Sequence, residues 1–178
     1  MSVVPATTAV EDVLALSPQG VLFSNGPGDP QACQYAVSAA QQLMAHGVPL
    51  LGICLGFQLL FETSEENGLH NGLGVFKGRV KAFKSDTLKI PHMGWNHLQL
   101  HKPNHPVLAQ MRTQMQVYFV HSYIFQLAQP SHCLATAPYG VDVAAVIGHE
   151  NVIATQFHPE KSQKAGQCFL QEFLKWQP

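Results

Sequence analysis

The stretch Leu50-Leu51-Gly52-Ile53-Cys54-Leu55-Gly56-Phe57-Gln58 decides the fold that this sequence predicts. The apolar run 48–53 is typical of a buried strand, and a helix is expected over 57–63. Between them a single thiol stands between two glycines, which is the G-x-nucleophile-x-G arrangement with Cys in place of Ser. Side chains at the two glycine positions would collide in so sharp a turn. Cys54 is therefore predicted to be a nucleophile, with a buried structural cysteine as the alternative.

The same turn is expected to activate the thiol. A helix N-terminus beside a sulfur atom favours the thiolate over the thiol, and the thiolate is the stronger nucleophile. The backbone N–H of Leu55 would then point toward an oxyanion that develops on the substrate.

A second motif lies near the other end of the chain, where the apolar strand 152–156 runs into Phe157-His158-Pro159-Glu160. A nucleophilic cysteine needs an imidazole as its base, and the imidazole needs an acceptor that holds its tautomer. His158 and Glu160 are two residues apart, so in an extended strand their side chains leave the same face. Because neighbouring parallel strands end at one edge of a sheet, Cys54 and His158 are expected to meet there. The alternatives are a surface histidine at a strand end and a solvated glutamate.

Helices and strands alternate in the first part of the chain, and short strands dominate the rest. The expected helices are 9–16, 32–46, 57–63 and 166–176, and the expected strands are 2–5, 20–24, 48–53, 74–76, 79–83, 97–100, 117–120, 134–137, 144–148 and 152–156. The alternation predicts an α/β fold in three layers, whose central sheet is mainly parallel and flanked by helices. The short, glycine-separated stretches of 72–100 predict a smaller antiparallel hairpin layer.

The composition narrows the function classes. The chain has 178 residues, a formal net charge of −1, 46% hydrophobic and 12% charged residues, which suits one domain, 1–178, with its own core. Near-neutral charge without a basic run argues against nucleic acid as a partner, and no apolar run is long enough for a membrane span. Four widely spaced cysteines and scattered histidines predict neither disulfides nor a metal site, and no cofactor is expected. A cytoplasmic location follows from the lack of a signal peptide.

Taken together, Gly52-Ile53-Cys54-Leu55-Gly56 and Gln156-Phe157-His158-Pro159-Glu160 resemble the triad (class I) glutamine amidotransferase family, whose fold is flavodoxin-like. Within that family, the stretches 91–96, 118–123 and 64–74 resemble the glutaminase subunit of imidazole glycerol phosphate synthase. This similarity covers about 47–178. The first third, with Ser24-Asn25-Gly26-Pro27-Gly28-Asp29-Pro30, looks more like the small subunit of carbamoyl phosphate synthetase.

The resemblance implies roles for further residues. The loop 25–29 would supply the backbone N–H of Gly26 to the oxyanion hole, although a simple tight turn is the alternative. The residues that would bind the substrate are Gly28, Gln58, His121, Ser122 and Tyr123. The residues that would face a partner are Pro91, His92, Met93, Trp95, Asn96 and Tyr118, with a packed aromatic as the alternative for Trp95.

The resemblance also implies an activity and a partner. The chain would hydrolyse L-glutamine to glutamate and ammonia through a Cys54 thioester, and would supply the ammonia to a (β/α)8-barrel cyclase of histidine biosynthesis. Two alternatives stay open: the glutaminase part of carbamoyl phosphate synthetase, and a scaffold that keeps the triad without aligning it. The sequence is also expected to begin at the family's second strand, without its first strand and helix, as an engineered chimera or a fragment would.

Overall fold

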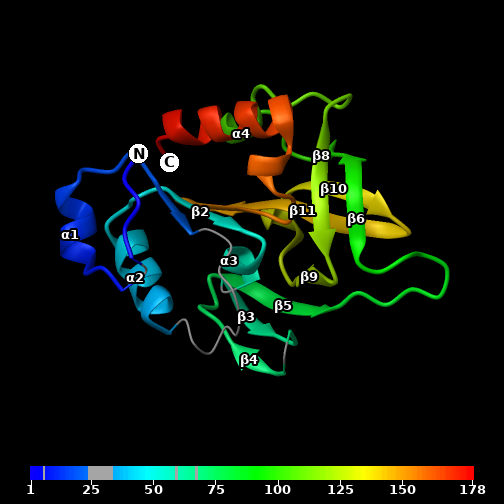
Figure 1. Ribbon diagram of the computed structural model, residues 1–178, viewed down its shortest axis with the longest axis horizontal. Coiled ribbons are helices and arrows are strands. Elements are labelled where there is room, and N and C mark those ends of the chain that lie inside the picture. Colours follow the sequence, from blue (N-terminus) through cyan, green and yellow to red (C-terminus); the bar gives the residue numbers. More distant parts are fainter. Residues whose placement is uncertain (6, 24–33, 59, 67) are drawn as a thin grey trace.

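The computed structural model describes residues 1–178 except 6, 24–33, 59 and 67. The helices are α1 (Val10–Ala15), α2 (Gln34–Ala45), α3 (Leu55–Gln58) and α4 (Gln163–Lys175). The strands are β1 (Val21–Phe23), β2 (Leu50–Ile53), β3 (Phe61–Ser64), β4 (His70–Asn71), β5 (Phe76–Ala82), β6 (His92–His97), β7 (Gln99–Leu100), β8 (Gln116–His121), β9 (Tyr123–Leu127), β10 (Cys133–Tyr139), β11 (Val141–His149) and β12 (Val152–Thr155). In Figure 1, α4 lies above the central strands, and α2, α3 and the strands β3, β4 and β5 lie below them.

The central sheet has the strand order β1-β2-β12-β11-β10-β7 among the described residues. The α/β class predicted from the sequence is confirmed, but the sheet is mixed rather than mainly parallel. Parallel pairing joins β1 to β2 and β2 to β12, while the ladders from β12 to β7 are antiparallel. The reason is the short connections at Gly140 and at Glu150–Asn151, because so short a turn joins only antiparallel strands.

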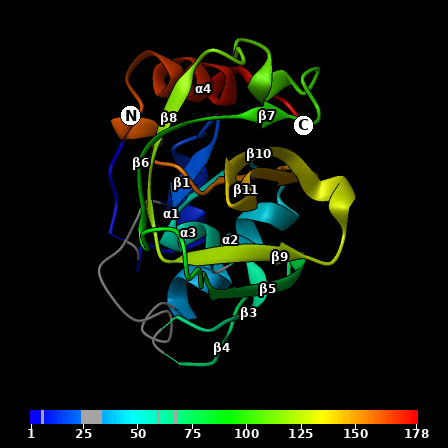
Figure 2. The same cartoon turned by 90° about the vertical axis from the view of Figure 1, so that its right-hand side faces the viewer.

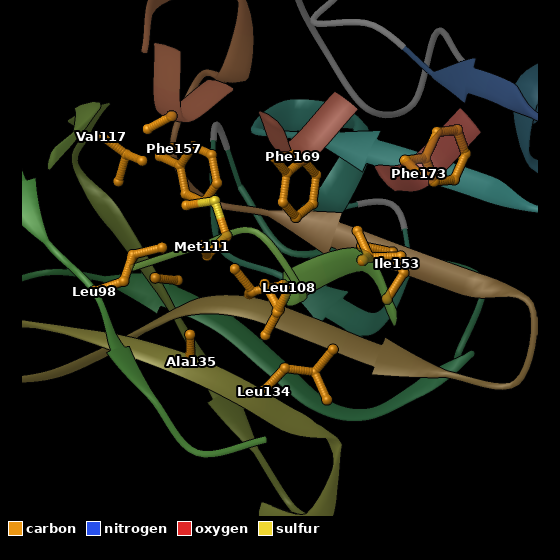
Figure 3. Close-up of a cluster of buried hydrophobic side chains, with 14 of the residues drawn as sticks. Leu98, Leu108, Met111, Val117, Leu134, Ala135, Ile153, Phe157, Phe169 and Phe173 are labelled. Carbon is orange, nitrogen blue, oxygen red and sulfur yellow. The ribbon is translucent and has the colours of Figure 1, made fainter. Parts of the chain in front are cut away.

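The neighbouring strands β2 and β12 are buried on both faces. Leu51 and Ile153 belong to a core beneath α4, whereas Leu50 and Val152 belong to a second core on the opposite face. Figure 3 shows Ile153 in the first core with Phe157 and aromatic rings from α4. Strands covered on both faces have nearly continuous apolar sequences, which explains why 48–53 and 152–156 stand out in the sequence.

A smaller four-stranded sheet, β4-β3-β5-β9, lies against the second core, and β6 and β8 pair as a two-stranded ribbon. The expected helix over 57–63 is wrong in its second half, because Phe61 stacks on Phe125 with 5.1 Å between ring centroids and enters this sheet. The two strands expected at 74–76 and 79–83 are replaced by the single strand β5, which spans residues 76–82, and residues 2–5 lie outside any strand. Figure 2 shows β9, β5, β3 and β4 stacked in succession.

The last helix closes the first core. Phe169 and Phe173 of α4 are buried, whereas Leu174, which the sequence pattern placed on the same face, is 60% exposed. Among the described residues, no helix is long and apolar enough to cross a membrane.

Candidate active site

Cys54 occupies the single residue between β2 and α3. Its backbone has φ = 51°, in the left-handed region that residues other than glycine rarely adopt, and its N–H donates to the Thr155 carbonyl at 3.0 Å. A Cβ on Gly56 would lie 2.6 Å from the Phe23 carbonyl oxygen, and one on Gly52 would lie 3.0 Å from the Gly56 carbonyl oxygen. The collision expected from the sequence is therefore confirmed at Gly56, while a Cβ at Gly52 would make a tight contact. The strained turn presents Cys54 at the end of its strand.

His158 and Glu160 form a direct contact just beyond β12. The Nδ1 atom of His158 and the Oε1 atom of Glu160 are 2.8 Å apart, and the imidazole is 2% exposed. The contact does not arise along an extended strand, because Pro159 begins a 3₁₀ turn (Pro159–Lys161) that turns the carboxylate back toward the ring. A carboxylate accepts hydrogen bonds, so Nδ1 carries a proton, and in the neutral form of the ring Nε2 is the atom with the lone pair.

The Nε2 atom of His158 is buried and has no hydrogen-bond partner among the described residues. Buried polar atoms are nearly always satisfied in folded proteins, so an unsatisfied one needs a functional or structural explanation. Here the unsatisfied atom is a basic nitrogen whose tautomer is fixed from the other side of the ring. This is the arrangement that a general base requires.

The backbone of His158 is held from two sides. Its N–H donates to the Tyr118 carbonyl at 3.0 Å, and its carbonyl accepts from Oγ of Ser162 at 2.6 Å. Ser162 Oγ in turn accepts from the Tyr118 N–H at 2.9 Å, and the Ser162 side chain is 1% exposed. The preceding residue, Phe157, is fully buried in the first core (Figure 3). Sequence reasoning missed Ser162, because a lone serine four residues after a histidine carries no distinctive signal.

The parallel pairing of β2 and β12 brings the two motifs to one sheet edge. Thr155 is the register partner of Ile53, and the Cys54 N–H bonds to Thr155, so both strands end together. His158 follows Thr155 by three residues at the same edge. The expected convergence of the two strand ends is thus observed. Within the residues that the structure describes, there is no hydrogen bond from His158 Nε2 to the Cys54 sulfur, so the pairing of these two atoms stays a prediction.

Gln58, at the end of α3, lies in a small polar cluster. Its amide oxygen accepts from Ser64 Oγ at 3.0 Å, and its amide nitrogen donates to the carboxylate of Glu66. The Gln58 side chain is 5% exposed. Sequence reasoning did not single out Glu66, although it lies in the stretch 64–74 that carried the family resemblance. The cluster places a carboxylate directly beside a predicted substrate-binding amide.

The other predicted substrate-binding residues lie where β8 turns into β9. His121 is 7% exposed, Tyr123 is half-buried and Ser122 is exposed. Gly26 and Gly28 lie outside the described residues. Leu55 is the first residue of α3, directly after Cys54.

The predicted partner-facing residues of β6 fall into an exposed group and a more buried group, because successive side chains of the strand point to opposite faces. Met93 and Trp95 are 60% and 44% exposed, and Trp95 packs edge-on against Tyr118 with 5.7 Å between ring centroids. Pro91 and Asn96 are half-buried. His92 is only 2% exposed, so its side chain faces the interior and a partner-facing role for that side chain is wrong. Alternate residues of a strand point to opposite faces, which is the physical reason.

Two buried histidines near this edge have lowered basicity. Burial lowers the pKa of His92 to about 4. The pKa of His121 is also lowered to about 4, mainly by burial; its hydrogen bond to the Tyr123 backbone opposes the shift, and the neighbouring imidazoles of His92 and His158 add to it. Both rings are therefore neutral near pH 7. In the described part of the chain, no group of three or more His, Cys, Asp or Glu side chains is arranged to hold a metal ion.

Comparison with known proteins gives consistent matches. The family model described as glutamine amidotransferase class-I matches residues 1–176. Subunit HisH of imidazole glycerol phosphate synthase from Rhodospirillum rubrum is 47% identical over 141 residues, covering 78% of this chain and 66% of the relative. The HisH subunit from Zymomonas mobilis is 39% identical over 181 residues, covering 93% of this chain and 83% of the relative.

A solved structure, PurLQS from Thermotoga maritima, superposes with a TM-score of 0.69 at 17% identity, covering 88% of this chain and 79% of that chain. At that identity the likeness concerns the fold alone. For several of the HisH relatives, the match spans only 61% to 66% of the relative's length.

Proposed function

Since this chain belongs to the class I glutamine amidotransferase family, we propose that it is a glutaminase that releases ammonia from L-glutamine, with Cys54 as nucleophile, His158 as acid and base, and Glu160 as the group that orients His158. One observation carries the proposal. The buried, unsatisfied Nε2 of His158 belongs to a ring fixed by Glu160 at 2.8 Å, at the sheet edge where the Cys54 turn ends.

The reaction runs in two halves. The Cys54 thiol first gives its proton to His158 Nε2. The thiolate attacks the side-chain amide carbon of glutamine, and His158 donates this proton to the amide nitrogen as the carbon–nitrogen bond breaks and ammonia leaves. A water molecule then attacks the glutamyl thioester while His158 Nε2 accepts its proton, and the carbon–sulfur bond breaks to give glutamate and the starting thiolate. The N–H groups of Leu55 and Gly26 would stabilise the oxyanion in both halves. No cofactor is needed, and a cytoplasmic location, where thiols stay reduced, suits this chemistry.

We place the amino-acid end of glutamine between two groups. Ser122 and Tyr123 would bind it from the end of β8, together with Gly28. The carboxylate of Glu66, held beside Gln58, has the charge to pair with the α-ammonium group. Glu66→Gln should therefore raise KM for glutamine far more than it lowers kcat.

The catalytic scheme is tested by Cys54→Ala. Glutamate release should vanish because no other group can form the thioester, while glutamine binding measured by calorimetry should persist. Cys133→Ala is the matched control, since this half-buried thiol begins β10, away from the Cys54 turn. Continued turnover in Cys54→Ala, or an equal loss in Cys133→Ala, would contradict the assignment.

The ammonia is proposed to pass to a (β/α)8-barrel cyclase of histidine biosynthesis. The reported relatives are subunits of imidazole glycerol phosphate synthase, which favours this partner over the large subunit of carbamoyl phosphate synthetase. The exposed side chains of Met93 and Trp95 would form part of the contact, beside a surface hollow of about 390 Å³ lined by Trp95, Met115 and Ser162 among others. Aromatic residues are enriched at such interfaces.

The partner assignment is tested by titrating the cyclase subunit into the chain. Binding and a rise in the glutaminase rate are expected, and Trp95→Ala should weaken the binding. Leu174→Ala, at a similarly exposed apolar position on α4, should leave it unchanged. If the cyclase neither binds nor raises the glutaminase rate, the partner assignment is wrong. The glutaminase assignment is tested separately, by Cys54→Ala.

A further inference from the structure

A buried pair of histidines bridges the two strands of the ribbon. His92 of β6 and His121 of β8 are register partners, and their side chains are 2% and 7% exposed. The Nδ1 atom of His92 and the Nε2 atom of His121 are 2.9 Å apart. Neither ring takes part in the proposed proton transfers, although His121 is one of the predicted substrate-binding residues and ends the strand that leads to Ser122 and Tyr123.

The direction of each hydrogen bond in this pair follows from one carbonyl group. His121 Nδ1 lies 2.8 Å from the Tyr123 carbonyl oxygen, which only accepts, so Nδ1 carries the proton. In a neutral ring, His121 Nε2 must then accept, and the donor is His92 Nδ1. His92 Nε2 is left as an acceptor, facing the amide nitrogen of Asn96 at 3.4 Å. The whole chain is consistent only when both imidazoles are neutral.

The His92 ring is also held by stacking. Tyr139 lies parallel to it at 3.9 Å between centroids, and Phe119 lies on it at 4.6 Å. Asn96 donates to the Pro138 carbonyl at 2.9 Å, which ties the ribbon to β10. Because stacking fixes the orientation of the His92 ring, its Nδ1–H is directed at Nε2 of His121.

The chain of hydrogen bonds ends at the backbone of the candidate site. Tyr123 follows the exposed Ser122, whose carbonyl accepts from the Phe83 N–H at 2.8 Å. Three residues before His121 on the same strand, the Tyr118 carbonyl holds the backbone N–H of His158. The strand β8 therefore links the segment 122–123 to the candidate base.

We propose that His92 and His121 act as a neutral pair of positioning residues that fixes the Tyr123 carbonyl, and with it the segment 122–123, relative to His158. The proposal rests on the proposed function, because it assigns the pair to the amino-acid end of the glutamine site. The low pKa values support it, since a proton on His121 would set two N–H groups against each other. The titratable groups that act on His121 are the imidazoles of His92 and His158.

Two substitutions of His92 separate the hydrogen bond from packing. Asn keeps an N–H close to the position of Nδ1 and loses the stacked ring, whereas Phe keeps the stacked ring and loses the N–H. Both are made in Cys54→Ala, and the Kd for L-glutamine is measured by calorimetry. His92→Phe should weaken binding about tenfold, the size of one lost hydrogen bond, while His92→Asn stays close to the parent.

The reverse order, equal losses in both variants, or no change in either would overturn the proposal. With the Cys54 side chain restored, His92→Phe should raise KM for glutamine and leave kcat nearly unchanged, and a loss confined to kcat would also overturn it. If the unsubstituted chain binds glutamine without hydrolysing it, the proposed function fails, while the order of the two Kd values still decides the role of the pair.

A second test needs no substitution and therefore still applies if the His92 variants fail to fold. Nitrogen NMR of the histidine rings between pH 5.5 and 8 should show His92 and His121 as neutral rings protonated on Nδ1. Protonation on Nε2 of either ring, or a charged ring in this range, would overturn the proposal.

Discussion

The sheet edge at Cys54 and the ribbon of β6 and β8 both carry buried polar groups, but the chain encodes them differently. At the edge, the groups come from two contiguous motifs, and backbone hydrogen bonds such as Cys54 to Thr155 and His158 to Tyr118 position them. In the ribbon, His92 and His121 are 29 residues apart and meet through strand register. The first region therefore depends on local backbone shape, and the second on cross-strand pairing.

The largest expected effect lies at the edge. His158→Ala should lower the glutaminase rate about 10²–10⁴-fold, because proton transfer by a positioned side chain contributes that much. The measurement is glutamate release under saturating glutamine. His149→Ala is the matched control, a partly exposed histidine at the end of β11 that stacks only on His132 among the described rings. Equal losses in the two variants would remove the distinction between the edge and the rest of the sheet.

A substitution at Gly56 tests the backbone shape itself. Gly56→Ala should lower the free energy of unfolding by about 1–3 kcal/mol, because its Cβ would lie 2.6 Å from the Phe23 carbonyl oxygen and force the turn to shift. Chemical denaturation measures this, and Gly47→Asn is the control. Gly47 has φ = 71°, a Cβ there would meet no atom within 4 Å, and Asn tolerates that conformation. A Gly56→Ala protein of unchanged stability would show that the turn is not tightly packed.

Ser162 connects the two regions, because its hydroxyl binds both His158 and Tyr118. Ser162→Ala should cost about 1–3 kcal/mol of stability, because it leaves the Tyr118 N–H without its acceptor and removes one of the two hydrogen bonds to the His158 carbonyl, which also accepts from the Lys161 N–H at 3.0 Å. It should also lower kcat through a misplaced His158. Ser38→Ala, at an exposed position in α2 where the hydroxyl accepts from Gln42, is expected to change neither quantity. A Ser162→Ala protein with normal kcat would show that the Ser162 hydroxyl stabilises the fold without positioning His158 for catalysis.

The last prediction concerns the dependence of stability on pH and the ribbon. The folded pKa of His92 and of His121 is about 4, below the unfolded value near 6.5, so the unfolded chain binds more protons between these values. Stability is therefore full above pH 6.5 and falls on acidification toward pH 4, by up to about 1.4 kcal/mol per pH unit for each ring. Denaturation at several pH values measures the slope, which should be shallower in His92→Phe. An equal slope in that variant would contradict the assigned pKa of His92.

The difference between the regions also explains what the sequence predicts. Cys54, His158 and Glu160 carry local signals, and the strand ends that hold Cys54 and His158 converge as expected. The bond between His92 and His121 depends on register, which neither motif nor periodicity reveals, so the sequence places His92 at the surface.

Two errors in the predicted fold have the same origin. Periodicity puts Phe61 in a helix, because its stacking partner Phe125 lies 64 residues away and leaves no local signal. The mixed sheet is missed because the parallel order of the first strands does not extend to the hairpins near the C-terminus. Contacts between distant segments decide both features.

The central claim is that the Cys54 thiol and the His158 imidazole act together on glutamine. A glutamine analogue with an electrophilic carbon in place of the side-chain amide tests it most directly, with peptide mapping by mass spectrometry. The predicted result is one adduct, on Cys54, that forms more slowly in His158→Ala and is prevented by added glutamine. Labelling of another cysteine, or labelling of Cys54 at the same rate without His158, would contradict the account.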